Sequence, residues 1–211
     1  MNLGIAGIHT NIGKTICSAV LVEALGFDYW KPVQAGSLDE TDSMWVKQHI
    51  SNTQSVIFPE RHLLKLAASP HWAAEKENIE IKAEDFVLPE SKNGLVVETA
   101  GGLMTPLSKT FLNIDLVKQL KLNVLLVSNT YLGSINHTLL TCQVLKQAGV
   151  NKVGIVFCGE KVTHATEFIL DYSGFPVVLH IPTLKLDRES VTEFAKEQKT
   201  TIKENLDELF G

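Results

Sequence analysis

Short hydrophobic runs recur along the chain, and between them lie segments in which apolar residues return every three or four positions. The runs predict strands at residues 2–6, 29–33, 95–98, 124–127, 153–157 and 177–181. The spaced segments predict helices at about 14–25, 114–120, 135–148, 164–172 and 201–209. The alternation of strands with helices, and the continuous Val, Ile and Leu runs that lack a polar–apolar alternation, predict an α/β fold. We expect a doubly wound, mostly parallel sheet with helices on both faces.

Two helix ends carry their own signals. Gly26 stands where the cap after the first helix belongs. Thr201, with Glu204 three residues later, has the pattern of a capping box that opens the last helix.

The interval from Gln34 to Asn93 is long for a crossover between two strands. We expect two or three short helices and turns there, with Pro59, Pro70 and Pro89 as breaks. The interval would serve partly as scaffold and partly as a cover over the active face. With 211 residues and no internal repeat, the chain is expected to form a single domain over residues 1–211.

Composition and charge narrow the class of protein. A formal net charge of -5 and the absence of a basic run give no support to nucleic acid as a partner. No apolar stretch approaches the roughly 20 residues that span a bilayer, so no membrane partner is expected. Three cysteines without CxxC spacing suggest reduced, buried thiols. The N-terminus lacks a basic leader and is interpreted as a strand. A soluble, cytoplasmic protein is expected.

Residues 7–15, with the sequence GIHTNIGKT, follow the first predicted strand and open the first helix. This context and the ending Gly-Lys-Thr predict a phosphate loop, although five residues rather than four separate its glycines. Backbone N–H groups would surround the phosphates, Lys14 would reach the outer ones and the Thr15 hydroxyl would bind Mg²⁺. The loop residues expected to hold ATP are Thr10, Asn11, Ile12, Gly13, Lys14 and Thr15.

Three further side chains are candidates for phosphoryl chemistry. Glu98 ends a predicted strand, where a carboxylate could hold Mg²⁺ or its water, or be an ordinary strand-end residue. Asp42 begins a predicted helix, and on its own pattern it fits an N-cap as well as a metal ligand. Lys31 follows the second strand and would either stabilise charge on a transferring phosphoryl group or be a surface lysine.

The helix after Gly133 opens with Ser134, Ile135, Asn136 and His137. Its free N–H groups could receive a carboxylate. A local hydrogen bond in the first turn explains His137 as well as chemistry does. The histidines lack metal-ligand spacing, so no zinc site is expected.

Taken together, these blocks resemble dethiobiotin synthetase, a member of the P-loop NTPase superfamily. The blocks occur in family order over residues 3 to 183, and the five-residue gap in the loop is also the family form. They are Gly7-x-x-Thr10-x-x-Gly13-Lys14-Thr15, Lys31-Pro32-Val33-Gln34-x-Gly36, Ser69-Pro70-His71, Glu98-x-Ala100-Gly101-Gly102, Thr105-Pro106 and Gly133-x-Ile135-Asn136-His137-Thr138-Leu139-Leu140-Thr141.

The resemblance implies ATP-dependent carboxylation of 7,8-diaminononanoate by CO₂ and closure to dethiobiotin, a step of biotin synthesis. A carbamate and a carbamic-phosphoric anhydride would be the intermediates. Lys14 and Lys31 would be catalytic, and Thr15, Asp42 and Glu98 would hold Mg²⁺. The resemblance also implies a homodimer, because the site for the substrate's carboxylate lies at a subunit interface in the family. Substrate contacts are expected from Lys31, Ala35, Thr105, Ser134, Ile135 and Asn136.

Several positions depart from the common family pattern. His9 and Asn11 replace acidic loop residues, and Ala35 replaces a hydroxyl residue. Thr99 replaces a glycine after Glu98, which is expected to alter the backbone angle there. Cys158 stands where the family usually has an asparagine that reads adenine, leaving backbone groups near Pro182 to contact the base. A relaxed base preference is therefore expected.

Two rival functions fit parts of the pattern. A non-catalytic or differently specific P-loop regulator would account for Ala35, Thr99 and Cys158, but it would not need two lysines at the phosphoryl group. A ParA-like ATPase fits less well, because Ile8 and His9 stand where that class has a second lysine.

Overall fold

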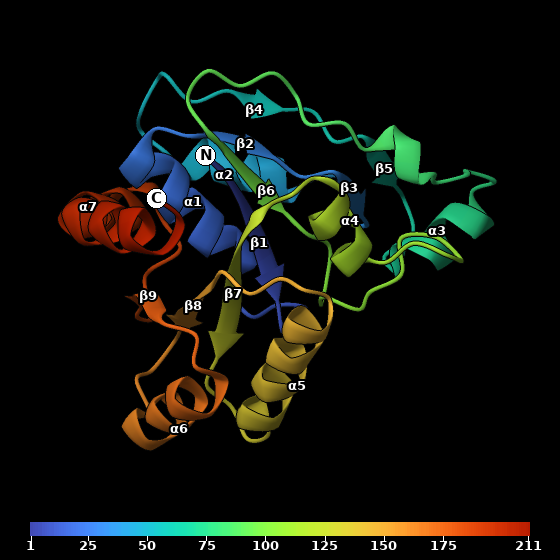
Figure 1. Cartoon of the computed structure of the whole chain (residues 1–211). Coiled ribbons are helices and arrows are strands. Elements are labelled where there is room, and N and C mark those ends of the chain that lie inside the picture. Colours follow the sequence, from blue (N-terminus) through green and yellow to red (C-terminus); the bar gives the residue numbers. More distant parts are fainter.

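The structure, a computed structural model that describes residues 1–211, is built around one central parallel sheet (Figure 1). The strand order is β4-β2-β6-β1-β7-β8-β9, and every pair in it is parallel. In chain order these strands are β1 (Asn2–Gly7), β2 (Asp28–Trp30), β4 (Ile57–Phe58), β6 (Leu95–Glu98), β7 (Asn123–Asn129), β8 (Val153–Cys158) and β9 (Val177–Ile181).

Helices cover both faces of this sheet. The helices are α1 (Lys14–Leu25), α2 (Asp42–His49), α3 (Pro70–Lys76), α4 (Asn113–Gln119), α5 (Ser134–Gln147), α6 (Thr163–Ser173) and α7 (Arg188–Phe210). Buried residues of α1, α2 and α7 share one hydrophobic cluster, and those of α3, α4, α5 and α6 share another. The expected doubly wound α/β architecture is thus confirmed.

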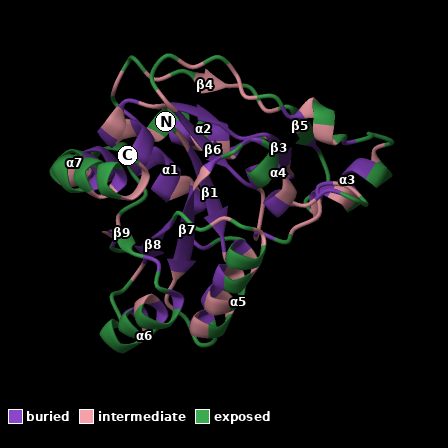
Figure 2. Cartoon of the chain, viewed as in Figure 1, coloured by how far each residue is buried: buried purple, intermediate pink, exposed green.

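The centre of the sheet is its most apolar part. Strand β1 pairs with β6 on one side and with β7 on the other, and Leu3, Ile5 and Ala6 are fully buried. Figure 2 shows the central strands as buried along most of their length. Continuous apolar runs form here because both faces of each strand are covered by helices.

The boundaries of most local elements agree with the sequence prediction. The phosphate-loop helix spans Lys14–Leu25, and Gly26 caps it in the left-handed conformation with φ 68°. Strands β6 and β9 have the predicted bounds, and the others differ by a few residues. No helix of the structure combines the length and the apolar character needed to cross a membrane.

The second predicted strand, 29–33, is wrong in its extent. Strand β2 ends at Trp30, and Val33–Ala35 forms a separate strand, β3, in a two-stranded sheet with β5 (His62–Leu64). Pro32 has no N–H to continue the ladder, and its carbonyl instead accepts hydrogen bonds from the N–H groups of Arg61 and His62.

The long interval 34–93 contains the two helices α2 and α3 and a 3₁₀ helix, Ala83–Asp85. It also contributes strand β5 and the edge strand β4, neither of which the pattern predicted. These strands have two or three residues each, too short to produce a recognisable period.

Residues 201–209 are helical as predicted, but the predicted start at Thr201 and its capping box are wrong. Residues Arg188–Phe210 form one continuous helix of 23 residues. Its cap is Asp187, whose side chain accepts a hydrogen bond from the Ser190 N–H. Thr201 lies in the interior of α7, where buried Ala195 and Ile202 continue the same apolar face.

Candidate active site

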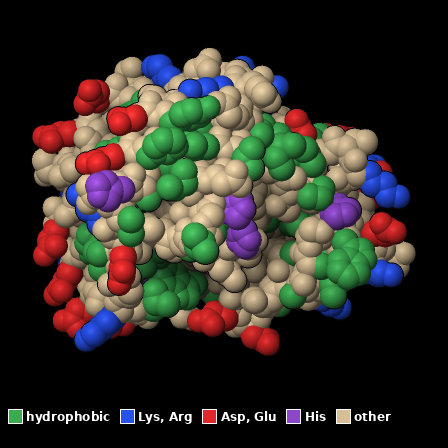
Figure 3. All heavy atoms as spheres, turned by 90° about the horizontal axis from the view of Figure 1, so that it is seen from below, with side chains coloured by type: hydrophobic (Ala, Val, Ile, Leu, Met, Phe, Trp, Pro, Cys, Tyr) green, Lys and Arg blue, Asp and Glu red, His purple; other side chains and the backbone are tan.

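The carboxyl ends of the parallel strands open on one face of the molecule, where ligands of doubly wound sheets bind. Figure 3 views this face, which is hollowed near its middle and carries most of its charged side chains at the margin. The residues that follow β1, β2 and β6 meet here, and they carry the predicted phosphoryl chemistry.

The phosphate loop joins β1 to α1. Gly13 immediately precedes the helix with φ 103°, and a Cβ there would lie 2.8 Å from the Cys158 Sγ, so only glycine fits. Asn11 also has a positive φ, of 59°. No side chain caps α1 and no acidic residue lies in its first turn. The N–H groups at this end are therefore available to an anion.

Lys14 lies largely buried beneath the loop. Its Nζ donates a hydrogen bond to the His9 carbonyl at 3.0 Å. Burial lowers the pKa of Lys14 to about 8, because the nearby Glu98 carboxylate only partly offsets the loss of hydration. A phosphate group would replace the carbonyl with a stronger partner for the ammonium.

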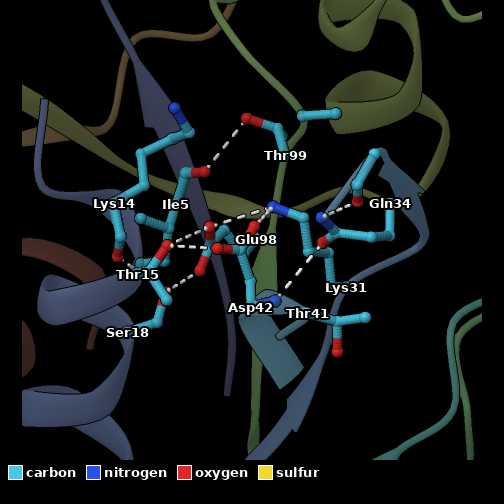
Figure 4. A network of polar contacts seen from close by, with 12 residues as sticks. Ile5, Lys14, Thr15, Ser18, Lys31, Gln34, Thr41, Asp42, Glu98 and Thr99 are labelled. Atoms are coloured by element: carbon cyan, nitrogen blue, oxygen red, sulfur yellow. Dashed lines mark hydrogen bonds and ion pairs between the residues drawn. The ribbon is translucent and has the colours of Figure 1, made fainter. Parts of the chain in front are cut away.

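Lys31, Asp42, Glu98 and Thr15 form a compact polar cluster (Figure 4). The Lys31 Nζ lies 2.5 Å from Asp42 Oδ2 and 3.0 Å from Glu98 Oε1. The Thr15 Oγ1 lies 2.9 Å from Asp42 Oδ1 and 3.1 Å from Glu98 Oε1. Four segments distant in sequence, namely the starts of α1 and α2, the residue after β2 and the end of β6, thus bring two carboxylates, one ammonium and one hydroxyl together.

The charges in this cluster stabilise one another. Burial opposes the Lys31 ammonium, but the carboxylates of Glu98 and Asp42 outweigh it and raise the pKa of Lys31. Burial likewise opposes ionisation of Asp42, but the Lys31 ammonium and the Thr15 hydroxyl lower its pKa. Lys31 is only 4% exposed, so the structure excludes the alternative of a surface lysine.

Glu98 is held from two sides. Its Oε2 accepts hydrogen bonds from Ser18 Oγ at 2.8 Å and from Tyr29 OH at 3.0 Å. Its Oε1 faces Thr15 and Lys31. Sequence reasoning missed Ser18 and Tyr29. In the sequence, only the position of Ser18 one helical turn after Lys14 suggests a role at the site. Tyr29 looks like any aromatic residue of a buried strand.

The ambiguity over Asp42 is resolved by its neighbour. Thr41 is the N-cap of α2, and its side chain accepts a hydrogen bond from the Met44 N–H at 3.2 Å. Asp42 is the first helical residue, and its own N–H lies 3.4 Å from Gln34 Oε1. The Asp42 carboxylate is therefore free of a capping role and points at Lys31 and Thr15.

The oxygens of Thr15, Asp42 and Glu98 form a donor set of the hard type that Mg²⁺ prefers. One oxygen of Asp42 and one of Glu98 each lie within 3.1 Å of the Thr15 hydroxyl. The Lys31 ammonium already contacts both carboxylates. The residues present therefore fit a divalent cation, with Lys31 as a second positive charge beside it.

The loop after β6 is fixed by two polar side chains. Thr105 Oγ1 accepts a hydrogen bond from the Gly102 N–H at 2.9 Å. Asn113, which is fully buried, donates through Nδ2 to the carbonyls of Ala100 and Gly102. The sequence prediction included Thr105 but missed Asn113, whose position inside an ordinary helix start gives no signal.

Thr99 follows Glu98 at the end of β6. Its φ is not positive, and its side chain donates a hydrogen bond to the Ile5 carbonyl at 3.1 Å. The hydroxyl thereby joins β1 to the end of β6, next to Glu98. That Thr99 changes the backbone angle relative to the family's glycine stays a prediction.

Apart from Lys31, the predicted substrate and base residues make no hydrogen bond or ion pair with the cluster. Ser134, Ile135 and Asn136 form the first turn of α5. Ala35 is half-buried in β3.

At the other end of the face, Cys158 is buried beneath the phosphate loop. Its Sγ lies 3.9 Å from the Gly13 carbonyl oxygen, and burial raises the pKa of the thiol to about 12. Pro182 is exposed just after β9.

A protein of Cytophaga hutchinsonii named ATP-dependent dethiobiotin synthetase is 47% identical to the chain over 193 residues. The match covers 90% of this chain and 93% of the relative. The chain belongs to the dethiobiotin synthetase family. A second dethiobiotin synthetase, of Christiangramia forsetii, is 48% identical and covers 74% of this chain and 75% of the relative. A third, of Campylobacter jejuni, is 40% identical over 84% of this chain and 86% of the relative.

Three further similarities concern the fold of the chain. A family described as AAA domain matches residues 1–190. A ParA family ATPase from Chlorobium tepidum has a TM-score of 0.59 at 12% identity, covering 99% of this chain and 95% of the other. MinD of Aquifex aeolicus, in its complex with MinC, has a TM-score of 0.56 at 17% identity, covering 98% of this chain and 95% of the other. At these identities the likeness concerns the fold alone.

Proposed function

We propose that the chain carboxylates 7,8-diaminononanoate with CO₂ and ATP and closes the product to dethiobiotin, as an ATP-dependent ligase of biotin synthesis. The observation that carries the mechanism is the Lys31 ammonium, which lies between Asp42 and Glu98 beside the phosphate loop. Family membership supplies the reaction, and this cluster supplies the charges that it needs.

The reaction has a balanced course. One amine of the substrate adds to CO₂ and loses a proton to give a carbamate, and a carbamate oxygen takes the γ-phosphoryl group of ATP, releasing ADP. The second amine attacks the carbamate carbon of this mixed anhydride, phosphate leaves, and the amine loses a proton as the cyclic urea forms. A carbamate is a weak nucleophile, so the enzyme must position it and neutralise its charge.

Different residues of the chain would serve the different parts of this reaction. Lys14 lies under the loop, where it would bind the outer phosphates, and Lys31 would bind oxygens of the carbamate and the transferring phosphoryl group. Thr15, Asp42 and Glu98 would hold Mg²⁺, which would neutralise phosphate oxygens when bound. Ser18 and Tyr29 orient Glu98 for this role.

The carboxylate of the substrate needs a site of its own. The N-terminus of α5 opens on the same face of the sheet, and Gly133 at φ 100° leaves its first turn uncapped. We propose that Ser134, Ile135 and Asn136 bind the carboxylate across a homodimer interface, with Ala35 and Thr105 lining the substrate closer to Lys31. A cytoplasmic location is part of the same proposal and agrees with three unpaired cysteines.

The regulator without catalytic activity is disfavoured by one observation. A protein that only binds nucleotide gains nothing from a second buried lysine, yet Lys31 is buried with two carboxylates arranged around it. Burying these charges carries a desolvation penalty, which a protein that only binds nucleotide has no reason to bear.

The proposed reaction is tested by phosphate release from Mg-ATP in bicarbonate, measured with and without 7,8-diaminononanoate. We expect release to depend on the diamine and to be matched by dethiobiotin in the products. If nucleotide binds but the diamine changes nothing, the ligase assignment is wrong.

A separate prediction follows from the pKa of Lys14. Near pH 8 about half of the Lys14 side chains are neutral in the free enzyme, because the pKa is about 8. Phosphate oxygens favour the ammonium and raise this pKa, so nucleotide binding should take up about half a proton at pH 8. Uptake should disappear below about pH 7, where Lys14 is already charged.

Calorimetry of nucleotide binding in buffers of different ionisation enthalpy measures this uptake. Lys14→Arg is the control, because arginine stays charged and should bind without the extra proton. Equal proton uptake by the wild-type enzyme and Lys14→Arg would show that the proton binds to a group other than Lys14.

A further inference from the structure

The position of the nucleoside follows from the strand order. Lys31, Asp42 and Glu98 mark the reactive end of the nucleotide, and they lie on the side of β1 occupied by β6 and β2. Strands β7, β8 and β9 lie on the opposite side. Because a nucleoside triphosphate is extended, its base must lie over the carboxyl ends of these three strands.

Cys158 is at this place but cannot read a base with its side chain. The sulfur is buried against Gly13, and a Cβ at Gly13 would lie 2.8 Å from it. The thiol is a weak donor and offers no paired donor and acceptor. Another polar side chain must therefore supply any selectivity that side chains provide.

Asn129 is the neighbour of Cys158 on the adjacent strand. The two residues are Cα partners at the last position of the β7–β8 register, so their side chains project from the same face of the sheet. Asn129 is half-buried. Its Oδ1 accepts a hydrogen bond from the Thr130 N–H at 2.6 Å and would lie 2.7 Å from a Cβ at Gly159.

The amide of Asn129 is only partly used within the chain. No group of the protein accepts a hydrogen bond from its Nδ2, and Oδ1 keeps a second lone pair beyond the one used by Thr130. The contact with Thr130 holds the amide in place. A donor and an acceptor thus lie side by side, oriented and available, next to the strand that carries Cys158.

We propose that Asn129 is the residue that determines base specificity, with its Nδ2 donating to a ring nitrogen of the base and its Oδ1 accepting from the exocyclic amino group. Adenine and cytosine each present this adjacent acceptor and donor, whereas guanine has a carbonyl, O6, at the position of the adenine amino group and presents two acceptors, O6 and N7, on that edge. The enzyme should prefer ATP and CTP over GTP. This expectation replaces the relaxed base preference that Cys158 alone suggested. This inference rests on the ATP-dependent reaction proposed above.

The test compares kcat/KM for ATP, CTP and GTP in the diamine-dependent reaction. The wild-type enzyme should favour ATP over GTP by roughly tenfold, and Asn129→Ala should bring the ratio close to one. Asn129→Leu should also bring the ratio close to one, and it does so without creating a cavity. Turnover with GTP should persist in both variants, which shows that they are folded.

Thr130→Ala is the matched control. It removes the hydrogen bond from Thr130 Oγ1 to the Glu160 carbonyl, in the loop after β8, and leaves the Asn129 amide intact. It should preserve the preference for ATP.

Three outcomes would overturn the assignment of Asn129: a wild-type ratio near one, an unchanged ratio in the Asn129 variants, or an equal loss for all three nucleotides. An unchanged preference would assign base reading to backbone groups near Pro182. Wild-type enzyme that shows no diamine-dependent turnover with any nucleotide would instead contradict the proposed reaction.

Discussion

Lys31→Ala is expected to lower kcat by about 10³-fold or more while nucleotide affinity falls far less. The ammonium lies within 3.0 Å of both Asp42 and Glu98, beside the loop that binds phosphate. It would act on charge that develops only as the phosphoryl group is transferred, so its loss affects the transition state more than the bound nucleotide. Steady-state kinetics and calorimetric titration with ATP measure the two effects separately.

A second property of Lys31→Ala does not depend on turnover. Removing the ammonium leaves two carboxylates without their cation, so Mg²⁺ should bind the nucleotide-free variant more tightly than the wild-type enzyme. Lys118→Ala, which removes an exposed lysine of α4, should alter neither turnover nor Mg²⁺ binding. Equal losses of kcat and ATP affinity would show that Lys31 serves only ground-state binding.

Glu98→Gln should reduce both activity and stability. Glutamine retains the shape and can still accept from Ser18 and Tyr29, but it removes one of the two charges that pair with buried Lys31. Because Glu98 is 1% exposed, breaking this pair should lower the free energy of unfolding by about 3 kcal/mol. Turnover should fall by about 100-fold with loss of a metal ligand.

Urea denaturation and Mg²⁺ titration check the two parts of this prediction. Glu80→Gln is the control, because it makes the same change in an exposed ion pair with Lys82. That variant should change the free energy of unfolding by less than about 0.5 kcal/mol. A similar effect in both variants would mean that the buried pair contributes little.

The sequence predicted the features that depend on neighbouring residues. Short segments of the sequence determine three of these features, and the structure contains all three. They are the strand–loop–helix around Gly13, the cap at Gly26 and the strand that ends at Glu98. Parallel strands bring their carboxyl ends to one edge, so the meeting of Thr15 and Glu98 also followed from the pattern.

What the sequence could not predict depends on distant contacts. Tyr29 acts on Glu98 only because β2 pairs with β6, which no local period reveals. The direction of the Cys158 side chain, towards Gly13, likewise depends on how α1 packs on the sheet. Asp42 was ambiguous because Thr41, one residue earlier, is an equally good cap, and only the structure shows which of them caps α2.

The packing of α7 has a consequence for synthesis of the protein. Residues of α7 complete the same hydrophobic cluster that buries α1, the helix at the phosphate loop. On the ribosome, α1 is made early, but this side of it has no partner until residues 188–210 have emerged. The packing that supports α1 is therefore completed only after α7 has been made.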